Sequence, residues 1–549
     1  MARRATTGRG PGSQANQRVG DSHGAGEGRK DGDSRRAGEG QRAGESQRTG
    51  ESQRPRRTGE GQRARRAGRR QGERGSGRRA DPVRLVAFEV LRASRERDAY
   101  ANLLLPALLR ERGLTGRDAA LATELSYGTL RGQATYDAVI AACSTRGLDQ
   151  IDPPVRDVLR LGAHQLLATR VGAHAAVATS VDLAREVAGP GTAGFVNAVL
   201  RRVATHDLEA WITAIAPDRA ADPLGHLAVR YSHPRWIVAA YSESLGEDGV
   251  AGPGDAAPAG AGAALAETEA ALAASAGRPS VTLCAVPGLA DQAELAADGA
   301  EIARWSAFGA YLPGGDPAAV AAVRQGRAAV QDEASQLATL ALTRVDVGTP
   351  DRLWLDLCAG PGGKARLLAG LAARSGARLV AADIRPHRAR LVSAAVTGAA
   401  GVVVADGTAP AWRPGSFDRV IADVPCSGLG ALRRRPDARW RKSPADVAGL
   451  GALQRRLLAS ALAAARPGGA VAYVTCSPHV GETRAVVADV LAGRDDVAVL
   501  DAPAVLAEVP DLRCPEPEGR YAQFWPHRHG TDAIFLALLQ RRPGPGGGG

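Results

Sequence analysis

The stretch Asp423-Val424-Pro425-Cys426-Ser427-Gly428 follows directly after the apolar run 417–422. A short apolar run that ends in an acid, a proline and a cysteine predicts a buried strand that opens into a tight loop. In an open α/β sheet, the chemistry lies just past the carboxyl ends of the strands. We therefore expect this loop to form part of a functional site.

Two other stretches have the same form. The run 470–474 precedes Thr475-Cys476-Ser477, and the run 353–357 opens into the glycine-rich loop Cys358-Ala359-Gly360-Pro361-Gly362-Gly363-Lys364. Apolar runs alternate with helical patterns throughout residues 326–541, which predicts a mostly parallel sheet with helices on both faces. We expect its strands near 353–357, 378–382, 401–405, 417–422, 470–475 and 533–538.

The glycine-rich loop has the features of a cofactor site. A strand, a glycine turn and a helix that starts near Lys364 direct backbone N–H groups at one point, although many such turns have no function. Asp383 ends the second strand, 19 residues after Lys364, where an acid typically binds a ribose hydroxyl. Asp406 and Asp423 end the next two strands, so four successive strands end in an acid when Asp356 of the first strand is included. Asp406 is a candidate to accept from an adenine amino group. The loop matches neither the dinucleotide pattern nor the triphosphate pattern, since Ala365 follows Lys364.

The six cysteines are Cys143, Cys284, Cys358, Cys426, Cys476 and Cys514. Their spacing offers no C-x-x-C pair for a structural metal, and we expect no metal. A lone cysteine is most often a small buried apolar residue, which is our interpretation of the first two and the last. Cys358 is expected to pack within the cofactor loop. Cys426 and Cys476 follow neighbouring strand ends, so we expect both thiols in one crevice, where a thiolate is a strong nucleophile.

The net charge of +12 resides in the first 80 residues. They contain 21 of the 70 Lys+Arg and 9 of the 58 Asp+Glu, which leaves 49 of each in the remainder. With no Leu, Ile, Phe, Tyr or Trp, this segment cannot bury a core and is expected to be disordered. It is either a polycation that attracts nucleic acid or a solubilising tail. The last residues, 542–549, are also expected to be disordered.

Residues 81–205 predict an all-helical domain, with helices near 82–95, 98–111, 116–131, 134–145, 173–187 and 191–204. A stripe of apolar residues runs along another helix from Val155 to Leu166. The stretches 124–131 (Glu-Leu-Ser-Tyr-Gly-Thr-Leu-Arg) and 194–202 resemble the NusB-type RNA-binding domain. The resemblance implies phosphate contacts for Arg131, Arg201 and Arg202, although each is equally typical of an ordinary helical bundle.

Residues 206–325 predict a linker and a small α+β subdomain. Ser280-Val281-Thr282-Leu283-Cys284-Ala285-Val286 has the pattern of a strand. The segment 244–278 is rich in Gly, Ala and Pro, which is typical of a loose low-complexity insertion.

The loops together resemble the RNA 5-methylcytosine methyltransferases of the Sun (RsmB) group. The resemblance rests on the stretches 356–364, 423–428 and 475–477, and also on 433–440 (Arg-Arg-Arg-Pro-Asp-Ala-Arg-Trp) and 530–535. It implies a Rossmann-like domain that binds S-adenosylmethionine through residues 358–364, Asp383, Asp406 and Asp423. Where the family has an acidic pair after the second cysteine loop, this chain has Glu482 alone, to which we assign no role.

The resemblance also implies the catalytic roles. Cys476 would attack carbon 6 of a cytosine, so that carbon 5 becomes nucleophilic, and Cys426 would assist release of the product. Asp423 would bind the edge of the base and stabilise charge that develops on the ring. A basic cluster with an aromatic residue is typical of an RNA-binding pocket mouth, so we expect RNA contacts from Arg433, Arg434, Arg435, Arg439 and Trp440.

We therefore predict an S-adenosylmethionine-dependent RNA cytosine-C5 methyltransferase, with small-subunit rRNA as substrate by resemblance alone. No apolar segment suggests a signal or membrane span, so we expect a cytoplasmic monomer. One alternative is a DNA cytosine methyltransferase, in which Cys426 would be the nucleophile. Another is a non-catalytic RNA-binding or antitermination factor built on the helical domain.

Overall fold

The structure is a computed structural model that describes residues 79–97, 99–246, 261–348, 350–396, 400–515 and 519–543. Residues 1–78 of the disordered tail predicted at 1–80, and residues 544–549 of the disordered end predicted at 542–549, lie outside this description. So does the part of the predicted insertion that spans 247–260.

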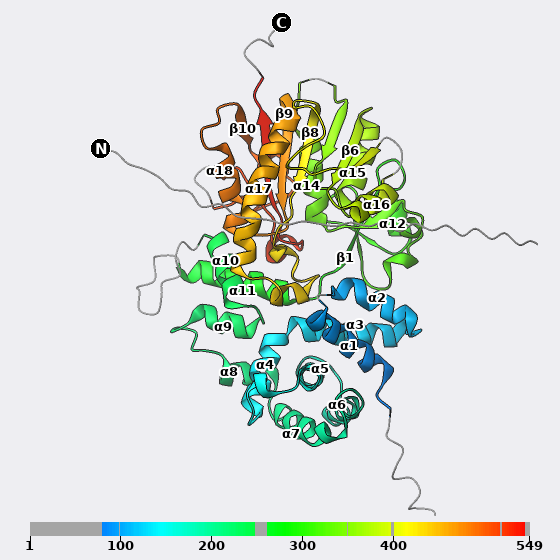
Figure 1. The fold of residues 1–549 in the computed structure, drawn as a ribbon, viewed down its shortest axis with the longest axis vertical. Coiled ribbons are helices and arrows are strands. Elements are labelled where there is room, and N and C mark those ends of the chain that lie inside the picture. Colours follow the sequence, from blue (N-terminus) through cyan, green and yellow to red (C-terminus); the bar gives the residue numbers. More distant parts are fainter. Residues whose placement is uncertain are drawn as a thin grey trace, which may run out of the picture. The chain divides into compact units, whose positions relative to one another are not determined.

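A bundle of helices forms the first part of the described chain (Figure 1). Helix α1 begins at a proline that follows Asp81, whose side chain accepts from Val83 N; proline is favoured at this position because its missing N–H is not needed there. The apolar stripe predicted from Val155 lies on α5, where Val158 and Leu159 are fully buried. The helices of this part are α1 (Pro82–Glu96), α2 (Ala101–Glu111), α3 (Gly116–Arg131), α4 (Gln133–Cys143), α5 (Pro153–Ala168), α6 (Ala173–Ala188) and α7 (Ala193–Val203).

Four more helices follow, α8 (Leu208–Ile215), α9 (Pro223–Arg230), α10 (Arg235–Ser244) and α11 (Ala261–Ala276). Helix α11 corrects one expectation, because we had placed residues 261–276 in a loose insertion. Their alanine content lowers the complexity of the sequence, but alanine is also the strongest helix former. Ala271 and Leu272 are fully buried in one cluster with Ile237 and Val238 of α10.

A small antiparallel sheet comes next, in the strand order β2-β3-β1-β4. The strand predicted at 280–286 is β1 in its centre. The strands are β1 (Val281–Ala285), β2 (Glu301–Ile302), β3 (Gly309–Leu312) and β4 (Ala328–Val330), with the helices α12 (Gln292–Ala297) and α13 (Ala321–Arg324).

The second large part is a sheet in the order β10-β12-β9-β8-β5-β6-β7, with β11 beside β12. Its five strands from β9 to β7 are parallel, and β12 and β10 are antiparallel to their neighbours. The strands are β5 (Leu353–Asp356), β6 (Arg378–Asp383), β7 (Ala400–Val404), β8 (Phe417–Asp423), β9 (Ala465–Thr475), β10 (Val497–Leu500), β11 (Ala522–Gln523) and β12 (Phe535–Arg541).

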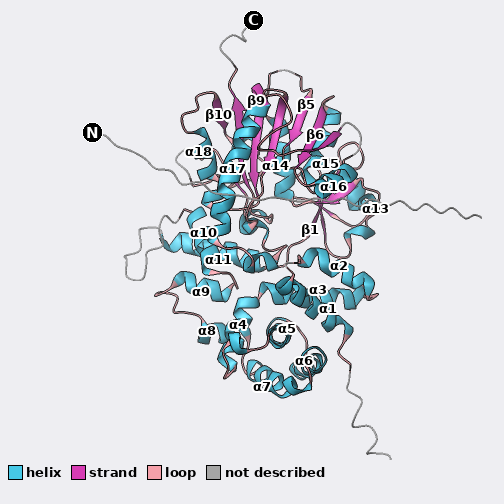
Figure 2. Ribbon diagram, in the orientation of Figure 1, coloured by secondary structure: helices cyan, strands magenta, loops and turns pink. Residues whose placement is uncertain are grey.

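Helices cover both faces of this sheet, as Figure 2 shows. Successive strand residues enter different cores: Trp354 packs with α14 and α15, whereas Leu355 packs with α17. Because both faces are buried, ligands can reach the sheet only at its edges. The mostly parallel Rossmann-like fold is thus confirmed. The helices are α14 (Glu333–Arg344), α15 (Gly363–Arg374), α16 (Pro386–Ala395), α17 (Pro444–Ala464), α18 (Arg484–Leu491), α19 (Ala502–Val505) and α20 (Pro526–His529).

Candidate active site

The two cysteine loops meet at the carboxyl ends of β8 and β9. These strands are parallel neighbours, and their register pairs Asp423 with Val474. Cys426 and Cys476 therefore leave the sheet at the same edge, and their Sγ atoms lie 3.2 Å apart. Both thiols are free and half-buried. The structure thus brings together the two cysteines that the strand-end pattern singled out.

A glycine joins these loops to the segment before β12. Gly430 donates its N–H to the Cys476 carbonyl at 2.9 Å and accepts from Ala533 N at 2.9 Å. A Cβ at this position would lie 1.8 Å from the Ala533 carbonyl oxygen. Only glycine permits this approach, since no side chain can be accommodated so close to a backbone oxygen.

Lys364 places a positive charge beside the thiols. Its Nζ lies 2.7 Å from Asp423 Oδ2 and 3.1 Å from Ser335 Oγ. Burial disfavours the charge on this amine, but the charge and the hydrogen bond of Asp423, together with the charges of Cys476 and Asp356, outweigh burial and raise the pKa of Lys364 above its ordinary value. Lys364 therefore stays protonated, and Asp423 is held in place by an ion pair.

The two thiols differ in how readily they ionise. The hydrogen bond from Cys426 lowers the pKa of Cys476 despite burial, and Lys364 and Arg435 lower it further. The same hydrogen bond, burial and the nearby charge of Glu482 raise the pKa of Cys426. Of the two thiols, Cys476 is therefore the more acidic, which makes it the better nucleophile.

The glycine-rich loop connects β5 to α15. Ala359 N donates to the Ala382 carbonyl at 2.8 Å, and Gly360 N donates to Asp383 Oδ2 at 3.1 Å. A Cβ on Gly360 would lie 2.3 Å from that oxygen, so the loop requires glycine there. Gly362 precedes the helix with a φ of 115°, which is also a glycine conformation. Cys358 is half-buried in the loop, and burial raises the pKa of its thiol well above the ordinary value, which suits packing rather than reaction.

Asp356 is a buried acid that makes no ion pair with any described residue, although the charge of Lys364 acts on it. Its side chain is almost inaccessible, and neither carboxyl oxygen has a hydrogen-bond partner of good geometry, although the Cys358 backbone lies nearby. Burial, followed by the charge of Asp423, raises the pKa of Asp356 to about 7. A buried carboxylate is costly unless it is paired. A cofactor that combines an ammonium group with a nucleoside fits this acid and the adjoining glycine loop.

The other strand-end acids make local contacts. Asp383 accepts from Gly360 N and from Arg385 N, the latter at 2.8 Å, so it also shapes the loop. Asp406 is exposed and accepts from the N–H and the hydroxyl of Thr408 at 2.8 Å each. Their roles toward a cofactor stay predictions. Ile384 follows Asp383 and is 59% exposed, and the sequence pattern did not single it out. Asp356 was noted as a strand-end acid, but no role was assigned to it.

The structure changes the role that was predicted for the arginines between residues 433 and 439. Arg433 and Arg434 form a cluster of ion pairs with Asp332 and Asp532. Arg439 is fully buried and donates to the carbonyls of three separate segments, namely Arg131, Ser232 and Ser275.

Arg433 and Arg439 are therefore buried by contacts within the protein, beside two short 3-10 turns at 429–431 and 436–440, and the RNA contacts predicted for them do not fit the structure. Arg434 keeps 23% of its side chain exposed, so its RNA contact stays a prediction. Trp440 is half-buried, with its indole N–H directed to the Leu130 carbonyl at 3.4 Å. Arg435 alone among the four arginines is exposed.

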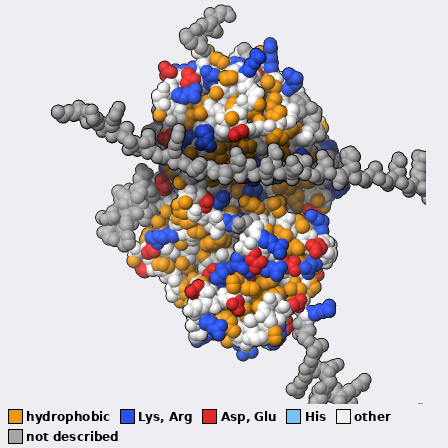
Figure 3. Space-filling view, viewed as in Figure 1, with side chains coloured by type: hydrophobic (Ala, Val, Ile, Leu, Met, Phe, Trp, Pro, Cys, Tyr) orange, Lys and Arg blue, Asp and Glu red, His pale blue; other side chains and the backbone are white. Residues whose placement is uncertain are grey.

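The arginines of the helical part also differ from one another. Arg201 and Arg202 are exposed on α7, whereas the side chain of Arg131 is 12% exposed and lies near Glu124. On the face that Figure 3 draws, basic and acidic side chains are interspersed.

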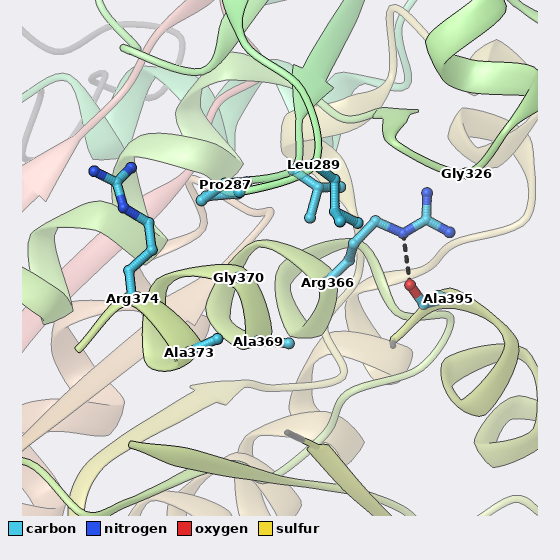
Figure 4. A pocket seen from close by; sticks show the side chains of 11 residues that line it. Pro287, Leu289, Gly326, Arg366, Ala369, Gly370, Ala373, Arg374 and Ala395 are labelled. Atoms are coloured by element: carbon cyan, nitrogen blue, oxygen red, sulfur yellow. Dashed lines mark hydrogen bonds between the residues drawn. The ribbon is translucent and has the colours of Figure 1, made fainter. Parts of the chain in front are cut away.

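A separate hollow lies along α15 (Figure 4). It is lined by that helix and by the loop 286–289, and Arg366 and Arg374 flank it. The Arg366 guanidinium donates to the Ala395 carbonyl at 2.9 Å. No residue of the cysteine loops or of the loop 358–362 lines this hollow, so it is distinct from the candidate site.

Within the ranges that the structure describes, no group of His, Cys, Asp and Glu side chains could hold a metal ion. In those same ranges, every helix is too short or too polar to cross a membrane.

Comparisons with known proteins bear on this geometry. Residues 345–540 match the family model described as 16S rRNA methyltransferase RsmB/F, and residues 81–205 match the NusB family. The protein Rv1407 of Mycobacterium tuberculosis, whose name describes it as a methyltransferase, is 51% identical over 464 residues, which is 84% of this chain and 97% of that protein.

A second relative is the ribosomal RNA small subunit methyltransferase B of Pseudomonas putida. It is 31% identical over 470 residues, which is 83% of this chain and 98% of that protein. The crystal structure of PH0851 shares the fold, with a TM-score of 0.64 at 20% identity over 84% of this chain and 98% of that chain. The cofactor is S-adenosylmethionine, whose ammonium group and nucleoside suit Asp356 and the loop 358–364.

Proposed function

This chain belongs to the RsmB/F family of S-adenosylmethionine-dependent methyltransferases, and from that premise we propose that it methylates carbon 5 of a cytosine in small-subunit rRNA. The observation that carries the proposal is the thiol pair at the carboxyl ends of two parallel strands, with Sγ atoms 3.2 Å apart. Carbon 5 of cytosine is a poor nucleophile, and covalent attack on the neighbouring carbon is the chemistry that activates it.

In this proposal the Cys476 thiolate forms a bond to carbon 6, and the electron pair of the 5,6 double bond moves toward carbon 5. S-adenosylmethionine, when bound, supplies the methyl group as an electrophile. Loss of the proton from carbon 5 then restores the double bond, breaks the sulfur–carbon bond and returns the thiolate to Cys476. The base must leave any stack to reach the thiols.

Cys426 has the properties required for the release step. The charge of Cys476 contributes to the raised pKa of Cys426. That charge disappears once the sulfur of Cys476 is bonded to carbon, so the pKa of Cys426 falls and its thiolate becomes accessible as a proton acceptor. Asp423 is held by Lys364 and its side chain is 33% exposed, which leaves it available to bind the edge of the base.

Arg435 is the arginine that we propose to contact RNA beside the thiols, and Arg201 and Arg202 are further candidates on the helical part. We retain residues 81–205 as the RNA-binding domain and place the reaction in the cytoplasm. The catalytic domain predicted at 326–541 starts after β4, because Ala328–Val330 pairs with β1 in the small sheet. The helical part then supports the enzyme rather than acting alone as a binding factor.

The test is bisulfite sequencing of rRNA from cells with and without the protein, together with transfer of labelled methyl to RNA by the purified chain. We expect one or more cytosines of small-subunit rRNA to lose protection when the protein is absent. Methylation of DNA instead of RNA, or RNA binding without methyl transfer, would refute the proposal.

A further inference from the structure

Glu482 lies beneath the two cysteine loops, in the short turn Val480–Glu482 after β9. The side chain is fully buried. Its carboxyl accepts from the Ser427 N–H at 2.7 Å, from the Ser427 hydroxyl, and from Gln454 Nε2 at 3.2 Å. A carboxyl group in such a position makes strong contacts, because an acceptor with negative charge forms shorter and stronger hydrogen bonds than a neutral one.

The contacts of Glu482 reach both thiol loops. Ser427 follows Cys426 in the chain and Ser477 follows Cys476, and the two hydroxyl oxygens lie 3.2 Å apart. Each hydroxyl has a single proton, and the carboxyl of Glu482 accepts that of Ser427. Ser427 is then left to accept from Ser477, so one chain of hydrogen bonds joins Glu482 to the residue after each thiol.

Glu482 is itself held from two sides. Its backbone carbonyl accepts from the Tyr473 hydroxyl of β9 at 2.8 Å. Gln454 of α17, which donates to the Glu482 carboxyl, also donates to the Pro425 carbonyl at 2.9 Å. A strand and a helix thus fix the acid, and the acid fixes the loop that carries Cys426. A buried polar group that loses its partner is costly, so removal of the Glu482 carboxyl would leave Ser427 N and Gln454 Nε2 without this acceptor.

We propose that Glu482 is a positioning residue that holds the Cys426 loop against the Cys476 loop and thereby sets the rate at which the covalent RNA adduct is released. The inference rests on the proposed function for its substrate. Glu482 has no accessible surface, so it cannot touch RNA and must act through Ser427. Misplacement of a reacting group by about 1 Å can cost on the order of 100-fold in rate.

The charge of Glu482 also affects the pKa of Cys426, and this effect offers a second way to test the positioning role. The hydrogen bond to Cys476 and burial are the main causes of the raised pKa of Cys426, and Glu482 adds to them. Removal of the carboxyl therefore makes Cys426 more acidic as well as less well placed. The resulting increase in thiolate can be measured without RNA and without cofactor.

The experiment compares Glu482→Gln and Glu482→Ala with Glu333→Gln. Glu333 is a matched control because it is equally buried and accepts from two backbone N–H groups, Trp305 N at 2.6 Å and Ser306 N at 2.8 Å, and from a tyrosine hydroxyl. Four quantities are measured: kcat for methyl transfer, KM for RNA, the fraction of enzyme trapped as covalent adduct, and the rate at which iodoacetamide alkylates Cys426 at pH 7.

We expect Glu482→Gln to lower kcat about tenfold and Glu482→Ala about 100-fold, with KM for RNA unchanged. The glutamine keeps an acceptor for Ser427 N but loses the acceptor for the Ser427 hydroxyl, which is why its effect is smaller. In both variants the adduct accumulates and alkylation of Cys426 accelerates. Glu333→Gln shows neither change, and Glu482→Asp recovers part of the lost kcat.

The inference is wrong if the Glu482 variants release adduct as fast as Glu333→Gln, or if they only melt at lower temperature without a change in alkylation. A different outcome separates the two proposals. Should the unmodified enzyme transfer no methyl group, while alkylation of Cys426 still depends on Glu482, the proposed function fails and the positioning role stands.

Discussion

The Cys426 loop and the Cys476 loop look alike in sequence and behave as opposites in the structure. Each follows a buried strand of the same parallel pair and places a cysteine before a serine. The hydrogen bond between the thiols is the largest cause of their difference in pKa. Lys364 and Arg435 then lower the pKa of Cys476 against the charge of Asp423, whereas Glu482 and Asp423 both raise that of Cys426. The comparison teaches that the surroundings, and not the local tripeptide, decide which thiol is more acidic.

The largest expected effect on methyl transfer comes from removal of the Cys476 thiol. Cys476→Ala should lower methyl transfer by on the order of 10⁴-fold and abolish the covalent adduct, because the attacking sulfur is gone. Labelled-methyl uptake and gel analysis of the adduct are the measurements. Cys143→Ala, which removes a buried thiol of the helical part, should leave both unchanged. An adduct that survives in Cys476→Ala would reverse the assignment of the two loops.

Removal of the Cys426 thiol should affect release of the covalent adduct instead of its formation. Cys426→Ala should slow turnover by about 100-fold or more while the covalent RNA adduct accumulates, because attack is retained and release is impaired. Denaturing gels of enzyme mixed with RNA and cofactor provide the readout. If Cys426→Ala instead prevents adduct formation, then the two loops share one role and the contrast between them is incorrect.

Loss of the buried cation should weaken the contrast between the thiols. Lys364→Met removes one cause of the low pKa of Cys476, so the pH at which Cys476 becomes reactive should rise by about one unit. Alkylation of Cys476 followed by mass spectrometry from pH 6 to 10 measures this without cofactor. An unchanged profile would mean that the hydrogen bond from Cys426 alone sets the acidity.

The cofactor side of the crevice should respond to pH through Asp356. Its pKa of about 7 lies above the ordinary value, so the folded apo protein holds a proton that the unfolded chain loses near pH 4. The stability that this proton contributes is fully present below pH 4 and is lost as the pH rises through 7. The ionised form is the one that attracts the cofactor's ammonium group, so binding should release a proton.

Affinity for S-adenosylmethionine should consequently rise about tenfold from pH 6 to pH 8. Calorimetry in two buffers of different ionisation enthalpy detects both the affinity and the released proton. Asp356→Asn should bind weakly at every pH, and a pH dependence that persists in this variant would assign the titration to another group.

The smallest effect is expected at the exposed cation. Arg435→Gln should change the alkylation rate of Cys476 only two- to threefold, because charges at the surface are screened by salt. The same variant should weaken RNA binding measurably in low salt and less in high salt. Equal RNA affinity for Arg435→Gln and the unmodified chain at low salt would exclude Arg435 from the RNA contact.

The parallel sheet and the closeness of the two thiols could be predicted, because both follow from local patterns of apolar residues and loops along the chain. Alternation of strands and helices implies parallel strands, and parallel strands end at one edge, so Cys426 and Cys476 had to lie close together. Helix α11 was missed because alanine-rich sequence suits both a loose segment and a packed helix. Only the partners on α10, more than twenty residues away, decide between them.

The arginines and the acids were harder for a different reason. Arg433 meets Asp332 and Asp532, each about a hundred residues away, and Glu482 meets Ser427 at a separation of 55 residues. No local pattern shows whether a charged side chain faces water or a distant partner. Asp356 was likewise noticed as a strand-end acid, but only the three-dimensional structure shows that it is buried without an ion pair to any described residue.

Arg439 has a consequence for how the protein can be divided. Arg439 lies thirteen residues after Cys426 in the chain. Its guanidinium donates hydrogen bonds to carbonyls in the last turns of α3 and α11 and in the linker at Ser232. A fragment that contained only the sheet would expose this cation and lose the carbonyls that anchor it. We therefore expect that the part of the chain with the large sheet does not fold normally without the helices, because they hold the segment 426–439 in place.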